Sequence, residues 1–433
     1  MAAQTVLIKG GRIIDPACGL DQTADLLLAD GKVARIGDRL TAGSAQTIDA
    51  SGLIVCPGLI DVHVHLREPG DEDEETIETG TAAATAGGFT SVACMPNTKP
   101  TLDDEASIEF ICHQSQRAGS CNVYPVGAIT KGRQGKELAE MGQMVRSGAV
   151  AFSDDGCGVA NTQLMIQALN YVRMFDKPIL QHCEDADVVG SGVMNGGATA
   201  VRLGLPGISP IAEELMLQRD LTLIRSTGAR YHVCHISTAR AVELVRQAKA
   251  AGLPVTAEAC AHHLVLTEEE CASYDPNFKM NPPLRTMDDV EACRRGVADG
   301  TIDCLASDHA PHGIQEKELE FLTAPFGIIG LETALPLFIK ALIEPGLMDW
   351  PAMIDRLTVR PAKLLSINKG TLAVGADADV TVIDPQCRWT IDVNQFRSKS
   401  RNCPFHGWQV TGRAVMTVVG GEIKHQLSHT AVA

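Results

Sequence analysis

Residues 61–67 read Asp-Val-His-Val-His-Leu-Arg and close an apolar run that begins at Leu53. Polar and apolar side chains alternate in this stretch. Such alternation is typical of a β-strand, in which side chains at positions i, i+2 and i+4 share one face. His63, His65 and Arg67 are therefore expected to point the same way, while the intervening apolar side chains, Val62 included, pack on the other face. Two imidazoles on one face can hold one metal ion, although two polar residues inside a barrel explain the pattern equally well.

The chain that follows repeats this unit, because short apolar runs alternate with helical patterns and are separated by Gly, Pro or Asn. Strands are predicted at 53–66, 89–96, 122–129, 149–153, 178–183, 230–236, 255–261 and 303–307. The clearest helices are predicted at 76–86, 103–118, 162–175, 211–226, 238–251, 288–299 and 330–343. Eight such units in succession predict an α/β fold of the (β/α)₈ (TIM) barrel type, whose active site lies at the carboxyl ends of the strands.

The two ends of the chain have a different pattern, with alternation around tight turns. Asp30-Gly31 and Gly420-Gly421 each separate two strand-like runs and are typical of two-residue hairpin turns. Neither end is long enough to close a core alone. We therefore expect residues 1–53 and 368–433 to form one small composite β-sandwich domain beside a barrel domain of residues 54–367.

Composition narrows the class of protein. Of the 433 residues 45% are hydrophobic and 21% charged, which is typical of a globular chain. The net charge of −16 disfavours a nucleic-acid partner and favours a small molecule. No stretch resembles a membrane span or a signal peptide, so we expect a cytoplasmic protein without membrane contact. The closest two of the 14 cysteines are nine residues apart, so a metal would need histidine and carboxylate ligands.

Further histidines and carboxylates stand where other predicted strands end. His182 ends the fifth strand, His235 the sixth, and Asp308 the eighth. A single buried histidine is usually a hydrogen-bonded core residue, but recurrence at the same end of successive strands places these side chains where barrels carry out catalysis. Together with His63 and His65 they suit zinc or a similar divalent ion, and they are numerous enough for two ions.

Two ions need a bridging ligand, and the fourth strand ends in Asp154-Asp155-Gly156. Either aspartate can bridge, and either can instead cap the following turn, which is the commoner role of an aspartate before glycine. The residues alone leave this choice open.

Other conspicuous residues have plainer interpretations. The acidic run 71–75 is expected to be a solvated helix start, where negative charge favours the helix dipole. His232 is assigned to packing or to support of a ligand, and His262-His263 has no evident partner. Four histidines are expected at the surface: His113, His406, His425 and His429.

Seven motifs together resemble the bacterial class I dihydroorotases of the cyclic amidohydrolase superfamily, over nearly the whole chain. They are residues 63–70 (HVHLREPG), 95–98 (MPNT), 154–156 (DDG), 182–185 (HCED), 235–237 (HIS), 280–285 (MNPPLR) and 307–312 (SDHAPH). The resemblance implies zinc-dependent hydrolysis of L-dihydroorotate to N-carbamoyl-L-aspartate, run towards ring closure in pyrimidine biosynthesis.

The resemblance also implies a role for each site residue. The first zinc ion would be held by His63, His65 and Asp308, and the second by His182 and His235. Asp155 would bridge them, where many relatives use a carboxylated lysine. Asp308 would also be the catalytic base, because it lies beside the bridging water that two ions activate. The substrate-binding residues would be Arg67, Asn97 and His312 for the carboxylate and Asn281 near the ring, and the arginine fork suits a carboxylate.

Two alternatives stay open. A hydantoinase- or allantoinase-type cyclic amidase would share the metal ligands but would not need Arg67 and Asn97, because its substrate lacks the carboxylate. A non-catalytic dihydroorotase-like scaffold for aspartate transcarbamoylase would have lost ligands, and none is missing here. We expect a homo-oligomer, a dimer, that can associate with aspartate transcarbamoylase.

Overall fold

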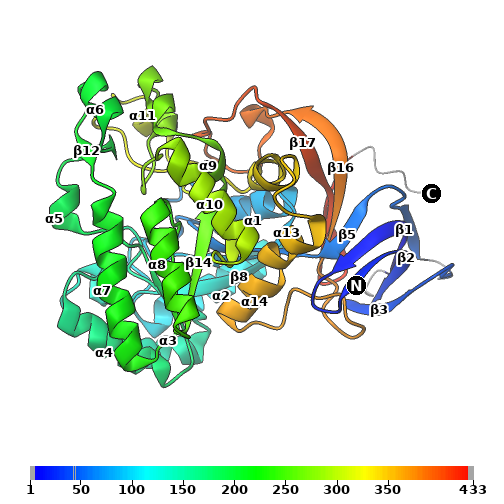
Figure 1. The fold of residues 1–433 in the computed structure, drawn as a ribbon. Coiled ribbons are helices and arrows are strands. Elements are labelled where there is room, and N and C mark those ends of the chain that lie inside the picture. Colours follow the sequence, from blue (N-terminus) through cyan, green and yellow to red (C-terminus); the bar gives the residue numbers. More distant parts are fainter. Residues whose placement is uncertain (1–4, 42, 44, 428–433) are drawn as a thin grey trace.

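The computed structural model describes residues 5–41, 43 and 45–427. Figure 1 shows helices packed around central strands, and a sheet built from both ends of the chain standing beside them. The central strands are β6 (Leu59–Val64), β7 (Phe89–Cys94), β8 (Asn122–Gly127), β9 (Ala151–Phe152), β10 (Ile179–Gln181), β13 (Tyr231–Val233), β14 (Val255–Cys260) and β15 (Cys304–Ala306).

These strands form the predicted barrel. They pair in sequence order from β6 to β15, and every neighbouring pair is parallel. A bridge between Val64 and His309, with the His65 N–H donating to the His309 carbonyl at 2.8 Å, joins the first strand to the segment that follows the last. The carboxyl ends of all eight strands therefore meet around one opening.

The longer helices cover the barrel, and local capping explains where several of them start. The Thr76 side chain accepts from the Thr79 N–H and begins α1, and Asp104 and Thr286 do the same for α2 and α10. The helices are α1 (Ile77–Ala86), α2 (Glu105–Ala118), α3 (Met141–Ser147), α4 (Thr162–Arg173), α7 (Ile211–Thr227), α8 (Ala239–Ala250), α10 (Met287–Asp299), α13 (Trp350–Leu357) and α14 (Val359–Leu365).

Short elements decorate the strand ends and connections. They are α5 (Ala186–Val189), α6 (Ala198–Leu203), α9 (Ala261–Val265), α11 (Ile314–Lys317), α12 (Ala334–Phe338), the paired strands β11 (Met194–Asn195) and β12 (Gly207–Ile208), the π-helical turn η4 (Ile339–Ile343), and the 3₁₀ turns η1 (Lys131–Arg133), η2 (Glu268–Ser273), η3 (Pro276–Phe278) and η5 (Val393–Gln395). Across the described ranges, no helix has both the length and the apolar composition needed to cross a membrane.

The two chain ends meet as predicted. Their strands are β1 (Val6–Asp15), β2 (Leu20–Ala29), β3 (Lys32–Gly37), β4 (Gln46–Asp49), β5 (Ile54–Pro57), β16 (Val380–Thr390), β17 (Gln409–Val419) and β18 (Glu422–Gln426). Both predicted hairpins are present, and β5 joins the ends because it pairs with β1 on one side and β16 on the other. The result is one eight-stranded mixed sheet with its own apolar core. The division into domains at residues 53/54 and 367/368 stays a prediction.

The predicted strand 53–66 is in fact two strands that belong to different sheets. The chain passes from β5 to β6 at Gly58, where an added Cβ would lie 2.0 Å from the Thr90 side chain, so only glycine fits this crossing. The expected alternation also fails at Val62, which packs inside the barrel with Ile60 and Leu180. The cause is an irregular register between β6 and β7 over residues 61–64, which resets the alternation.

Candidate metal centre

The structure brings together the histidines and aspartates that the sequence places at strand ends. Each exposes 8% or less of its surface, so the group is buried as a unit. The members are His63 on β6, His65 after β6, Asp155 after β9, His182 after β10, His235 after β13 and Asp308 after β15.

Asp155 lies at the centre of this group. Its Oδ1 is 3.3 Å from His63 Nε2, 3.7 Å from His235 Nε2 and 3.8 Å from His182 Nδ1. Its Oδ2 is 3.7 Å from His65 Nε2. One carboxylate therefore faces two pairs of imidazoles, which is the arrangement that a bridging ligand needs.

Asp308 completes one side of the group. Its Oδ1 is 3.1 Å from His65 Nε2 and 3.5 Å from His63 Nε2. Ligand atoms roughly 2.1 Å from a tetrahedral ion lie about 3.4 Å from one another, so these separations suit zinc. Five sets of three side chains in the described residues lie close enough together to hold an ion, and two of the five consist of residues of this group: His63, His65 and Asp308, and His63, Asp155 and His235.

Unpaired polar atoms at the centre also fit a cation. His63 Nε2 and Asp155 Oδ1, which lie 3.3 Å apart, are buried and have no hydrogen-bond partner among the described residues. Burial raises the pKa of Asp155, but the neighbouring histidines outweigh it and hold that pKa well below its usual value. Burial likewise disfavours a charged His63, yet Glu258, Asp308 and Asp155 raise its pKa well above the ordinary value. The site is therefore built to hold positive charge between carboxylates.

The adjacent Asp154 has a different environment, which separates the two aspartates. Its carboxylate accepts from the backbone N–H groups of Ile129 and Thr130 at 2.8 and 3.0 Å and from the Thr130 hydroxyl. Asp154 thus fixes the loop after β8, and among the described residues it has no contact with the histidines of the centre. Of the two candidates, the geometry favours Asp155 as the bridge.

A carboxylate that the sequence analysis did not single out lies behind the histidines. Glu258 on β14 is fully buried and accepts from His63 Nδ1 at 2.6 Å and His232 Nε2 at 2.9 Å. Its Oε1 also accepts from the His235 N–H at 3.2 Å. A carboxylate on Nδ1 leaves Nε2 of His63 free to face the centre and fixes that tautomer. The assignment of His232 to a supporting position agrees with this contact.

The expectation of a solvated acidic run at 71–75 is wrong for its last two residues. Glu75 is fully buried and lies 3.3 Å from His309 Nε2, and it also accepts from the Lys399 N–H at 3.2 Å. Glu74 lies 2.9 Å from Arg67 Nε. Two of the partners of Glu75, Ser398 and Lys399, come from a segment more than 300 residues later, which no local pattern reveals.

The residues expected to bind substrate surround the centre. Arg67 Nη2 is 3.5 Å from His312 Nε2, so these two side chains are adjacent. Asn97 Oδ1 is 2.8 Å from His65 Nδ1, and its Nδ2 is 3.4 Å from Asp155 Oδ2. Asn281 Nδ2 is 3.3 Å from His182 Nε2, and its buried Oδ1 has no partner among the described residues.

Three residues at the site have backbone conformations that side chains rarely adopt. The φ angles are +60° at Arg67, +31° at His235 and +48° at Asp308. Such strain persists where the surrounding structure imposes it, and it concentrates at active sites.

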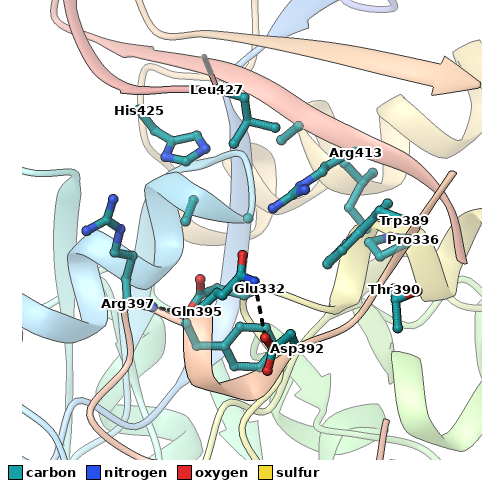
Figure 2. Close-up of a pocket in the computed structure, with 15 residues that line it drawn as sticks. Glu332, Pro336, Trp389, Thr390, Asp392, Gln395, Arg397, Arg413, His425 and Leu427 are labelled. Atoms are coloured by element: carbon teal, nitrogen blue, oxygen red, sulfur yellow. Dashed lines mark hydrogen bonds between the residues drawn. The ribbon is translucent and has the colours of Figure 1, made fainter. Parts of the chain in front are cut away.

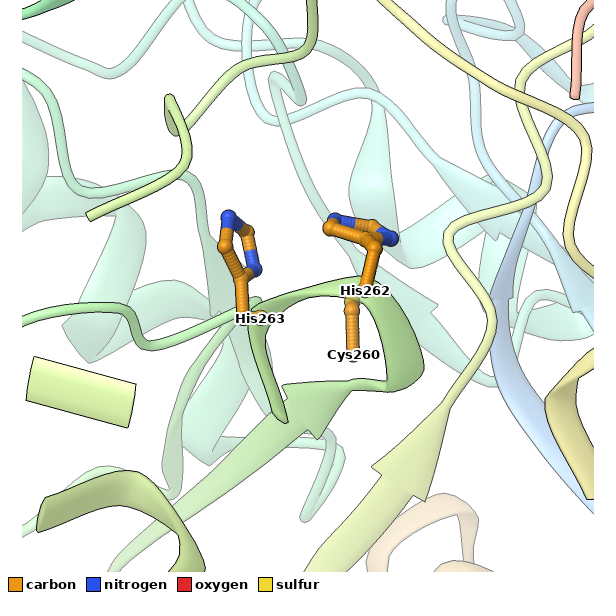
Figure 3. A group of neighbouring side chains, drawn as sticks. All are labelled: Cys260, His262 and His263. Carbon is orange, nitrogen blue, oxygen red and sulfur yellow. The ribbon is translucent and has the colours of Figure 1, made fainter. Parts of the chain in front are cut away.

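His262 and His263 follow β14 on the short helix α9, close to Cys260 (Figure 3). Figure 3 shows the two rings side by side, and their centroids are 4.3 Å apart. His263 Nε2 lies 2.9 Å from the Pro282 carbonyl, so it supports the segment that carries Asn281. Burial lowers the pKa of His262 to about 4, and its imidazole is neutral at physiological pH.

The fold and the centre together place the protein among the metal-dependent amidohydrolases. The family model described as "Dihydro-orotase-like" matches residues 52–241. Curated relatives cover nearly the whole chain: dihydroorotase of Syntrophotalea carbinolica is 52% identical over 98% of this chain and 99% of its own, and that of Pelotomaculum thermopropionicum is 51% identical over 97% and 98%. The chain belongs to the dihydroorotase family.

Solved structures agree on the architecture. The L-hydantoinase of Arthrobacter aurescens superposes with a TM-score of 0.88 at 27% identity, covering 99% of this chain and 97% of that chain. The D-hydantoinase from Thermus sp. gives 0.83 at 27% identity, with the same coverage. The hydantoinases therefore share this fold, while the relatives about half identical to the chain are dihydroorotases.

Proposed function

We propose that the chain catalyses the reversible hydrolysis of L-dihydroorotate to N-carbamoyl-L-aspartate, and that ring closure serves pyrimidine biosynthesis. One observation carries the proposal: Asp155 lies between two pairs of buried imidazoles in a chain about half identical to dihydroorotases over nearly its whole length. Retention of every proposed ligand argues against the scaffold alternative.

The proposed metal ligands follow from the geometry of the centre. His63, His65 and Asp308 would hold one zinc ion, and His182 and His235 a second, with Asp155 between them. Bound there, two divalent ions would lower the pKa of a water between them and polarise the scissile carbonyl.

Asp308 is the proposed acid and base. In hydrolysis a carboxylate oxygen of Asp308 takes a proton from the attacking water as the new C–O bond forms at the ring carbonyl carbon. The ring C–N bond then breaks, and Asp308 returns the proton to the departing nitrogen. Ring closure runs the same proton transfers in reverse. Burial raises the pKa of Asp308, but His63 and His65 outweigh it and hold that pKa below its usual value, so the carboxylate is ionised.

Recognition of the substrate carboxylate is assigned to Arg67, His312 and Asn97, with Asn281 near the ring. The closeness of Arg67 and His312 supports this assignment, because the two donors can share one anion. The contact of Asn97 with His65 gives it a second role, which is to hold that imidazole with Nε2 towards Asp155.

Substrate choice separates dihydroorotase from the cyclic amidases that share its fold. The test compares turnover of dihydroorotate and hydantoin by the protein and by Arg67→Lys, with metal content measured in both. We expect dihydroorotate to be preferred, and the variant to lose at least ~10-fold in kcat/KM for it while keeping its metal, because a point charge replaces the planar fork. Equal turnover of hydantoin by the unaltered protein would instead support the hydantoinase alternative.

The assembly and location of the protein remain part of the proposal. We infer a cytoplasmic homodimer that can associate with aspartate transcarbamoylase, in keeping with the metabolic role. Light scattering of the protein, alone and mixed with that enzyme, tests the dimer and the association. The mass of a single chain in the protein alone would contradict the dimer, and no added mass in the mixture would contradict the association.

A further inference from the structure

A cavity of about 190 Å³ lies between the barrel and the mixed sheet, and none of its lining residues belongs to the proposed metal centre. The end of α1 and the start of α12 line one side, and β16, β17 and β18 line the other. Figure 2 shows Arg397 and Arg413 on opposite sides of the cavity, with His425 above and Glu332 below.

Two cations that line this cavity form no ion pair within the described residues. Arg413 places its guanidinium over the Trp389 ring, 4.2 Å from the centroid. Neither Arg413 nor the side chain of Arg397 has a hydrogen bond or an ion pair with any residue in the described ranges. The chain has 53 acidic and 37 basic residues, so carboxylates are plentiful. A shortage of carboxylates therefore does not explain why both guanidiniums lack an ion pair in the described ranges.

The carboxylates that line the cavity are otherwise engaged. Glu332 Oε1 accepts from the N–H groups of Arg397 and Ser398 at 2.8 and 3.2 Å, and burial raises its pKa to about 7. Asp392 accepts from the Asn394 N–H and the Gln395 amide. The charge of Glu332 acts on Arg413 at a distance, but neither carboxylate forms an ion pair with Arg397 or Arg413 in the described ranges.

His425, expected at the surface, is instead half-buried in this cavity. Burial and the positive charges of Arg397 and Arg413 together lower its pKa to about 4. Because both guanidiniums act on the same imidazole, His425 lies within the positive electrostatic potential of each. A neutral imidazole still has an N–H to donate.

We propose that this cavity is a binding site for the oxyanion group of a small metabolite, a phosphate or a carboxylate. Arg397 and Arg413 form the ion pairs with the anion, and the His425 N–H donates a hydrogen bond. Guanidinium groups suit this role because their planar donors match the oxygens of both kinds of anion. The site is independent of the proposed metal ligands.

Calorimetric titration of the metal-loaded full chain with inorganic phosphate and with succinate, at constant ionic strength, tests the proposal. We expect one of the two anions to bind more tightly, which identifies the source as phosphate or carboxylate. Arg397→Gln and Arg413→Gln should each weaken that binding by ~10-fold or more. The matched control is Arg388→Gln, because Arg388 is exposed on the same strand as Trp389 and lies outside the cavity.

Failure to bind either anion would overturn the proposal. So would binding that both cavity variants leave unchanged, because the anion would then sit elsewhere, as at the metal centre. Arg397→Gln keeps the test valid if Arg413→Gln unfolds, since Arg397 is exposed and its side chain has no protein partner in the described ranges. Dihydroorotate turnover in anion-free buffer should be unchanged in Arg397→Gln, so this outcome is separate from the proposed function.

Discussion

Glu258→Gln is predicted to weaken metal binding without unfolding the protein. The native carboxylate accepts from His63 Nδ1 at 2.6 Å and from His232 Nε2 at 2.9 Å. A glutamine keeps one acceptor oxygen but turns an NH₂ group towards the other imidazole, so one buried hydrogen bond to a charged group is lost. Such a bond contributes about 1.5–3 kcal/mol. If the loss falls on His63, the affinity for the first ion should drop roughly 10- to 100-fold.

The assay is a chelator-competition titration of metal-free protein, with the melting temperature of the metal-free form measured in parallel. The matched control is Thr256→Val, because Thr256 Oγ1 lies 2.8 Å from His232 Nδ1 at the far end of the same chain of contacts. We expect this control to bind metal almost as tightly as the unaltered protein. Unchanged metal affinity in Glu258→Gln would refute the reasoning, as would a control that loses affinity to the same extent.

Three further outcomes are expected. Asp155→Asn should lose metal, first from the site with only His182 and His235, whereas Asp154→Asn should keep metal and lose about 1–3 kcal/mol of stability with its loop contacts; metal analysis of both variants reverses the assignment if the losses are exchanged. Metal content should fall between pH 7 and pH 5, because protons compete for the imidazoles, and a flat profile would contradict histidine ligation. Burial lowers the pKa of Lys317 to about 7 from 10.5, so the unfolded chain binds more protons between these values and the free energy of unfolding gains from this lysine as pH rises; urea unfolding at pH 7 and 9 should show a smaller gain in Lys317→Met, and an equal gain would exclude the lysine as its source.

Much of the fold could be predicted because it rests on local signals. Each barrel strand is a short apolar run, and a functional side chain at its end is brought to the common opening by the parallel arrangement alone. The choice between Asp154 and Asp155 could not be made locally, since it depends on the Thr130 loop from the preceding unit. The roles assigned to the individual site residues stay predictions.

The residues that support the centre could not be predicted from local patterns, because their partners lie far away in the sequence. Glu258 stands in an ordinary strand, and its importance arises only when β14 brings it against His63, which is 195 residues away in the sequence. Glu75 looks like part of a solvated acidic run, and its burial is imposed by Ser398 and Lys399. Contacts of this range leave no periodic signal in either partner.

The pairing of β5 with β16 determines when the protein can finish folding during its synthesis. Cys56 pairs with Thr381, which the ribosome adds 325 residues later. At ~5–20 residues per second this interval is about 15–65 s, during which one edge of the amino-terminal strands has no partner. An unpaired edge invites association with other chains. The barrel strands are complete earlier, but Asn402, which accepts from the His312 N–H at 3.3 Å, arrives 90 residues after His312. A nascent chain therefore has the histidines of the buried centre long before the segments around them are complete.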